Sequence, residues 1–255
     1  MSLLTSIILF TLLGGVLSVL LASFFLVIPS HWRKVSMPHM VSFATGALLG
    51  TAFLALLPHA LTEATVDPHK VFMAVLAGLL VFFFMEKLVI WRHCHSSHCD
   101  THTDYEGGHT GTMVLIGDGL HNFVDGVLIA AAFLTDEHLG VITAVAVAAH
   151  EIPQEIGDFA VLLHSGFSRS KALLFNVLAS LTTVVGGVLA YYALSDVLSI
   201  LPYVLAVAAS SFIYIAVADL IPGLHKETRL SATATQIFLI VAGIVVIYIA
   251  HSNLH

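Results

Sequence analysis

The sequence contains eight long runs of apolar residues, and each is long enough to cross a lipid bilayer as a helix. About twenty consecutive, mostly apolar residues span the hydrocarbon core when they are helical. The runs lie at residues 3–28, 40–61, 71–91, 112–134, 139–164, 171–194, 200–221 and 232–250. The pattern therefore predicts an all-α polytopic membrane protein, with eight transmembrane helices in a single transmembrane domain that covers residues 1–255.

Charged residues are too scarce for a soluble fold of this length. Hydrophobic residues make up 58% of the sequence and charged residues 10%, whereas soluble domains carry about 25% charged residues. The formal net charge of -7 gives no basic surface that would attract a nucleic acid. The lipid bilayer is therefore an expected partner, and nucleic acid is not.

The basic residues predict how the chain is oriented in the membrane. Eight of the nine, all except Lys70, fall at the ends of the first, third, fifth and seventh runs: Arg33, Lys34, Lys87, Arg92, Arg169, Lys171, Lys226 and Arg229. Because basic residues accumulate on the cytoplasmic side, this side is expected to be cytoplasmic and both termini are expected outside. The first run lacks the features of a cleaved signal peptide, so we expect a retained helix.

Two internal similarities suggest a repeated architecture. The segment at 56–63 (LLPHALTE) resembles the segment at 220–227 (LIPGLHKE), and the fourth and fifth runs each carry a polar string that begins with histidine. Weak repeats of inverted topology that meet at a central site are typical of secondary transporters. An inverted-repeat helical bundle is therefore expected, although chance similarity between Leu/Pro-rich helix ends would explain the first pair equally well.

Polar residues of metal-binding type interrupt the fourth and fifth apolar runs. Ionisable groups at membrane depth are costly, and they usually mark an ion or proton path. The polar residues are Asp118, His121, Asn122 and Asp125 in the fourth run, and His150, Glu151, Gln154, Glu155 and Asp158 in the fifth. Spacings of three and four place them along one face of each helix, so we expect the two polar faces to meet.

The donor atoms of these residues suit a transition metal. Imidazole, carboxylate and amide oxygen together favour zinc, iron(II) or manganese over calcium or magnesium, which prefer all-oxygen shells. Buried polar residues that merely bond the helices together are the alternative, but the number at ligand spacing favours a site. The pattern predicts a divalent-metal transporter, with Gly126 and Gly157 allowing neighbouring helices to approach closely.

The strings His121-Asn-Phe-Val-Asp-Gly126 and His150-Glu-Ile-Pro-Gln-Glu-Ile-Gly-Asp158 resemble the signatures of the ZIP (Zrt/Irt-like) metal transporters, and the second is closest to the LIV-1 branch. The resemblance implies metal movement into the cytoplasm by alternating access, and a homodimer. By position, it implies two adjacent metal sites lined by His121, Asn122, Asp125, His150, Glu151 and Gln154. The LIV-1 string usually has histidine where Gln154 stands. Further candidates, as ligands or their supports, are Glu155, Asp158, Asp118, His59 and Asp219.

The loop at 92–110 is rich in histidine and cysteine. Its candidate ligands are His93, Cys94, His95, His98, Cys99, His102 and His109. We expect the loop to be cytoplasmic, where thiols stay reduced, and to act as a low-specificity receiving or sensing site for metal. A polar linker that binds metal only incidentally is the alternative. Elsewhere, Asn176 and Ser180 are expected either to form a third polar wall or only to bond between helices, and Glu86 to pair with Lys87.

Other functions fit the sequence less well. The string at 150–154 nearly matches the His-Glu-x-x-His motif of zinc proteases, but Gln154 replaces the second histidine. An intramembrane metalloprotease is therefore a weak alternative, and we expect no enzymatic activity and no cofactor, with zinc or a related metal as the transported substrate. A membrane metal sensor or receptor is the other alternative. The cell (inner or plasma) membrane is the expected location, with an organelle membrane as the alternative.

Overall fold

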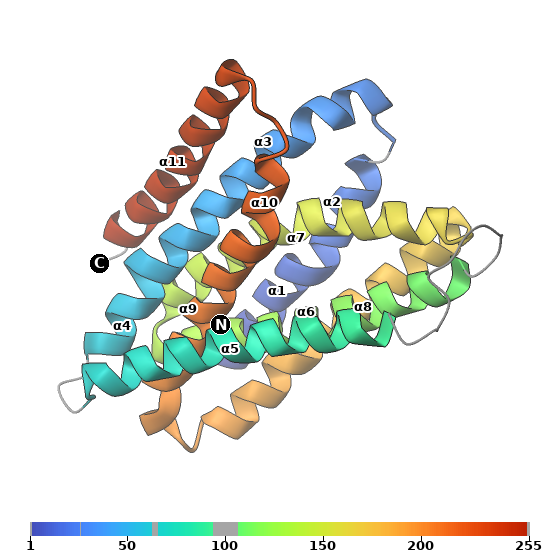
Figure 1. The fold of residues 1–255 in the computed structure, drawn as a ribbon. Helices are drawn as coiled ribbons and strands as arrows, with labels where there is room; N and C mark the ends of the chain where they lie inside the picture. The colour runs from blue at the N-terminus through green and yellow to red at the C-terminus, as the bar shows by residue number, and fades with distance from the viewer. Residues whose placement is uncertain (1, 26, 63–65, 94–106, 254–255) are drawn as a thin grey trace.

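The computed structural model of the protein describes residues 2–25, 27–62, 66–93 and 107–253, and every regular element in these ranges is helical. The helices pack side by side into one bundle (Figure 1). The elements are α1 (Leu3–Leu12), η1 (Leu13–Leu17), α2 (Ser18–Phe25), α3 (Ser30–Gly50), η2 (Thr51–Leu56), α4 (Leu57–Thr62), α5 (Pro68–His93), α6 (Gly107–Thr135), α7 (Glu137–His164), α8 (Arg169–Leu194), η3 (Leu198–Ile200), α9 (Leu201–Tyr214), η4 (Ile215–Leu220), α10 (Ile221–Leu224) and α11 (Leu230–Asn253).

Within the described residues, seven helices are long and apolar enough to cross a membrane. These spans are Leu3–Phe25, His31–Thr62, Pro68–Lys87, Val114–Thr135, Arg169–Leu194, Leu198–Leu224 and Leu230–Ser252. The eighth predicted segment forms α7, which is as long as the others but is not among the seven. Its middle carries several polar and ionisable residues, which lower its hydropathy.

The helices extend beyond the apolar runs that predicted them, most of all at the second run. That run was expected to begin at residue 40, whereas α3 begins at Ser30. The extra turns contain His31, Arg33 and His39, so a search for apolar residues stops short of them. A helix needs only its own backbone hydrogen bonds, and α3 therefore continues past the end of the apolar run.

The fifth segment occupies the centre of the bundle. α7 contacts α2, α3, α6 and α8, while α11 packs along α3 and α5 packs along α9 (Figure 1). Half of the 28 residues of α7 are buried, including His150 and Glu151. A helix that other helices surround does not need a uniformly apolar face toward lipid. This position explains how α7 can hold ionisable groups.

Glycines allow α6 and α8 to approach closely beside these groups. A Cβ atom on Gly126 would overlap the backbone carbonyl of Thr183, and one on Gly186 would overlap that of Phe123. The expectation of close helix approach at Gly126 is therefore confirmed. The same expectation for Gly157 is wrong, because a Cβ there would meet nothing within 4 Å.

The two segments with similar sequences also share a backbone irregularity. A six-residue π-helical stretch precedes each Leu/Ile-Pro pair: η2 ends immediately before Leu57-Pro58, and η4 ends immediately before Ile221-Pro222. Proline has no N–H, so the carbonyl group four residues earlier loses its helical partner. A local change to π-helical bonding accommodates such a gap. The similarity is thus one of backbone structure as well as of sequence.

Candidate metal centre

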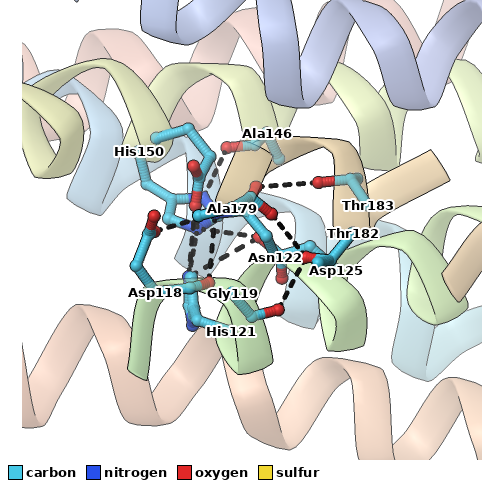
Figure 2. Close-up of polar contacts among 11 residues, drawn as sticks. Asp118, Gly119, His121, Asn122, Asp125, Ala146, His150, Ala179, Thr182 and Thr183 are labelled. Carbon is cyan, nitrogen blue, oxygen red and sulfur yellow. Dashed lines mark hydrogen bonds and ion pairs between the residues drawn. The ribbon is translucent and has the colours of Figure 1, made fainter. Parts of the chain in front are cut away.

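Four ionisable side chains from α6 and α7 converge at the centre of the bundle. The ligand atoms of His121, Asp125, His150 and Glu151 all lie within 4.8 Å of one another. His121 and Asp125 are one turn apart on α6, while His150 and Glu151 are neighbours on α7. Figure 2 shows the side chains of His121, Asp125 and His150 pointing into the space between the two helices. The expected meeting of the two polar faces is therefore present.

The distances within this four-residue centre suit a shared ion. Each histidine approaches both carboxylates through Nε2. The Nε2 atom of His121 lies 3.6 Å from Asp125 Oδ2 and 3.3 Å from Glu151 Oε1. The corresponding distances from His150 are 3.3 Å and 3.6 Å. The two Nε2 atoms are 3.2 Å apart. Four donor atoms at mutual distances of this size can surround one metal ion, since zinc bonds to nitrogen and oxygen are about 2 Å long.

The backbone of α7 orients the His150 ring. Its Nδ1 lies 3.1 Å from the carbonyl oxygen of Ala146, one turn earlier. When Nδ1 carries the proton and donates it to this carbonyl, Nε2 keeps its lone pair and faces the centre. A hydrogen bond of this kind is the usual way in which a protein fixes the tautomer of a metal-binding histidine.

The carboxylates of the centre are buried without hydrogen-bond partners. Asp125 and Glu151 are both 0% exposed, and none of their four carboxylate oxygens accepts a hydrogen bond. Buried polar atoms are nearly always bonded, and two buried carboxylate charges beside neutral histidines are strongly unfavourable. A cation held between these side chains and the two histidines would remove that cost.

A second group of carboxylates adjoins the first and shares one member with it. Oxygens of Asp118, Glu151 and Glu155 lie within 4.8 Å of one another, and all three residues are buried. Neither oxygen of Glu155 has a hydrogen-bond partner. Asp118 and Glu155, which the sequence offered only as further candidates, therefore lie in direct continuity with the four-residue centre.

Asn122 connects the carboxylates to α8. Its side-chain nitrogen donates to Asp118 Oδ1 over 2.8 Å, while its oxygen accepts from the hydroxyl of Thr183 over 2.7 Å (Figure 2). The sequence analysis missed Thr183. A signal was available, because Asn176, Ser180 and Thr183 follow the same four-then-three spacing as the polar rows of the other two helices.

A cavity of about 400 Å³ leads to the centre from one side. α5, α6, α7 and the helix α9–η4 enclose it, and its polar wall includes Asp118, His121, Gln154, Asp158 and Asp219. The His121 side chain is 24% exposed, whereas that of His150 is 0% exposed. Three residues predicted from sequence, Gln154, Asp158 and Asp219, thus line the approach to the four-residue centre.

Glu86 belongs to this cavity too, in contrast to the sequence-based expectation. It accepts a hydrogen bond from the hydroxyl of Tyr214, and both residues line the cavity. Among the residues that the structure describes, no ion pair joins Glu86 to Lys87, which instead lies 6.0 Å from the ring centre of Phe83. Consecutive residues on a helix point in different directions, and this explains the error.

Among the remaining predicted ligands, His59 belongs to neither ligand group. His59 on α4 bonds the carbonyl oxygen of Ala55, and its ring lies 5.4 Å from that of His251. His93 is the last residue of α5, and His109 lies in the first turn of α6. The other loop candidates, Cys94, His95, His98, Cys99 and His102, fall outside the described residues.

Known proteins resemble the chain over most of its length. The ZIP zinc transporter family matches residues 91–251. Zinc transporter ZIP13 of Pongo abelii is 32% identical over 224 residues, which is 81% of this chain and 64% of the relative. Human zinc transporter ZIP4 is 32% identical, over 73% of this chain and 38% of the relative. Human zinc transporter ZIP10 is 37% identical, over 52% of this chain and 17% of the relative. The chain thus spans less than two thirds of each of these relatives.

Proposed function

Because the chain belongs to the ZIP zinc transporter family, on its LIV-1 branch, we propose that it carries a divalent transition metal, zinc foremost, across a membrane. The observation that carries this proposal is the buried centre of His121, Asp125, His150 and Glu151. Two imidazoles and two carboxylates form a donor set that zinc prefers. Iron, manganese, cobalt and cadmium accept similar ligands, so competition between metals must establish the order of preference.

α7 is the eighth transmembrane helix in this proposal. It has 28 residues, enough to cross the hydrocarbon core, and the ionisable groups in its middle are buried against other helices. Eight crossings place both termini on the same side, which the distribution of basic residues marks as the outside. The matching π-helical segments before Pro58 and Pro222 support an inverted repeat.

The cavity supports an inward-facing conformation and metal movement into the cytoplasm. Its wall includes Glu86, near the end of α5 that carries Lys87 and Arg92, and by the positive-inside rule that end is cytoplasmic. In the opposite direction along α6 from the centre, Ile129 and Phe133 are almost completely buried. A metal ion bound at the centre would therefore leave through the cavity.

Carboxylates along the cavity provide a sequence of oxygen ligands for a departing ion. Glu151 belongs to both ligand groups, so an ion could pass from the histidine-rich group to Asp118 and Glu155 without losing every protein ligand. Asp158 and Asp219 are also in the cavity wall. Oxygen ligands alone hold zinc less tightly than a set that includes imidazole, which favours release over retention.

The homodimer of this proposal rests on the resemblance, whereas the role of the loop at 92–110 rests on its histidine and cysteine content. The homodimer, the choice between cell membrane and organelle membrane, and the role of the loop at 92–110 as a metal-receiving site remain predictions. We propose that Gln154 acts from the cavity wall, as a weaker ligand than the histidine usual in the LIV-1 string. Gln154 also weakens the metalloprotease alternative, because the His-Glu-x-x-His motif needs a second zinc-binding histidine at this position.

Radioactive zinc uptake into proteoliposomes tests the function. The variants are His121→Ala and His150→Ala, and the control is His164→Ala on the same helix. His164 is exposed and bonds the carbonyl four residues earlier, just as His150 does, but it lies outside the ligand groups. We expect saturable uptake in the wild type and the control, and only background in the two variants.

Two other results would redirect the proposal. Zinc binding without uptake in the wild type would assign the protein as a sensor or receptor. Uptake that survives both substitutions would place the transport path elsewhere in the bundle. Competition by unlabelled iron(II), manganese, cobalt and cadmium would then rank the substrates.

A further inference from the structure

A second cavity, of about 380 Å³, lies at one end of the bundle, where the end of α2 and the start of α3 meet the end of α7 and the start of α8. It is separate from the metal centre and shares no lining residue with the first cavity. Its lining residues are Ser23, Val27, Arg33, Phe159, Leu163, Arg169, Ser170 and Leu173.

The charged side chains in the described lining of this cavity are both positive. Arg33 and Arg169 line it, and none of the carboxylates that the structure describes does. The Nε atom of Arg33 is buried and has no hydrogen-bond partner. A buried guanidinium donor without an acceptor is unfavourable, and an arginine side chain can bind a phosphate through two parallel hydrogen bonds.

The start of α8 adds donors to the same place. Ser168 caps the helix. The N–H of Ala172 donates a hydrogen bond to the carbonyl oxygen of Ser168 over 2.9 Å. The preceding amides, at Arg169 and Ser170, lie in the first turn, where N–H groups have no partner within the helix. The positive end of the helix dipole also favours an anion there. Both residues line the cavity.

The rest of the wall is apolar and continues to the surface of the bundle. Phe159 is buried, whereas Val27 is 79% exposed. Free phosphate has no apolar part that could contact this wall, whereas the acyl chains of a phospholipid would cover it. This end of the bundle also carries the basic residues that we assign to the cytoplasmic side, and anionic lipids are concentrated in that leaflet.

We propose that this cavity binds a phosphate group at the membrane surface, supplied by an anionic phospholipid or by free phosphate. The two arginines and the first turn of α8 hold the phosphate. The apolar wall favours the lipid as its source. This site goes beyond metal transport, and its test does not depend on transport activity.

The test uses the purified full-length protein in a detergent that carries no charge. Its binding of three probes is measured by titration: dihexanoyl phosphatidylglycerol, dihexanoyl phosphatidylcholine and inorganic phosphate. The variant is Arg33→Gln with Arg169→Gln. The matched control is Lys226→Gln with Arg229→Gln, which removes two positive charges at positions outside the cavity lining. The melting temperature of each variant confirms that it is folded.

We expect saturable binding of phosphatidylglycerol that weakens roughly 25-fold in the Arg33/Arg169 variant, about fivefold for each arginine, and is unchanged in the control. Phosphatidylcholine and inorganic phosphate should bind more weakly than phosphatidylglycerol. If inorganic phosphate binds as tightly and competes, the cavity is a site for free phosphate, and the preference for lipid is wrong. Equal binding of phosphatidylcholine, or an equal loss in the control, would overturn the site altogether.

Discussion

The hydroxyl of Thr183 is expected to support metal binding although it lies outside both ligand groups. It donates to the Asn122 side-chain oxygen over 2.7 Å, and Asn122 in turn donates to Asp118. The change Thr183→Val keeps the shape of the side chain but removes the donor. Asn122, which is fully buried, then has an unpaired oxygen and can rotate away from Asp118.

The magnitude follows from what is left unpaired. A buried acceptor without a partner costs about 1–3 kcal/mol in soluble proteins, while hydrogen bonds between membrane helices average about 0.6 kcal/mol and reach about 1.7 kcal/mol. We therefore expect a loss of roughly 1 kcal/mol in the free energy of unfolding. Loss of an outer-shell hydrogen bond typically weakens metal binding by about 10–100-fold, so the effect on zinc affinity should exceed the effect on stability.

The neighbouring residue Thr182 is the matched control. Its hydroxyl lies 2.6 Å from the backbone carbonyl of Gly119, so Thr182→Val also removes a hydrogen bond between α6 and α8. That bond does not touch a predicted ligand. Zinc dissociation constants and unfolding free energies would be measured for both variants. Similar losses of stability with weakened zinc binding only in Thr183→Val would support the reasoning, and equal zinc affinities in the two variants would refute it.

Three further substitutions test the packing of α6 against α8 and the cap of α7. Gly126→Ala should lower the free energy of unfolding by about 1–3 kcal/mol, because its Cβ would overlap the backbone of α8. Gly157→Ala should be neutral or stabilising by up to about 1 kcal/mol. Equal thermal stabilities of the two variants would contradict the close approach of α6 and α8 at Gly126. Asp136→Ala should cost about 1 kcal/mol at neutral pH, because its carboxylate caps α7 through the N–H of Leu139 over 2.9 Å. Burial acts to raise the pKa of Asp136, but hydrogen bonds from the backbone outweigh it and lower the pKa. A lowered pKa stabilises the fold above the unfolded value of about 3.9, so the difference from wild type should shrink as pH falls through the folded pKa; a difference that grew instead would contradict this assignment.

Much of the fold could be predicted because lipid imposes a simple rule on sequence. Apolar runs located all the long helices, although their ends were missed wherever a helix continues into polar residues, as α3 does from Ser30. The π-helical segments could not be predicted. Two of them, η2 and η4, depend on how a helix compensates for Pro58 and Pro222, and proline alone does not specify the form of that compensation. The third, η1 (Leu13–Leu17), has no proline in or next to it.

The part of the candidate site that depends on residue spacing along a single helix could be predicted. Spacing placed His121 with Asp125 on one face of α6, and chemistry suggested that His150 and Glu151 would meet them. Contacts between helices were harder to foresee. Glu86 meets Tyr214 across 128 positions of the chain, and only the packing of α5 against α9 brings the two together.

The position of α7 has a consequence for how the protein is made. The helix that carries half of the metal ligands is the one that its own hydropathy does not mark as a membrane span. A segment of this kind partitions poorly from the translocon into lipid when it is alone. Only Asp136 separates α7 from α6. We therefore expect the two helices to enter the bilayer together as a hairpin, so that the ligands of the two helices first meet during membrane insertion.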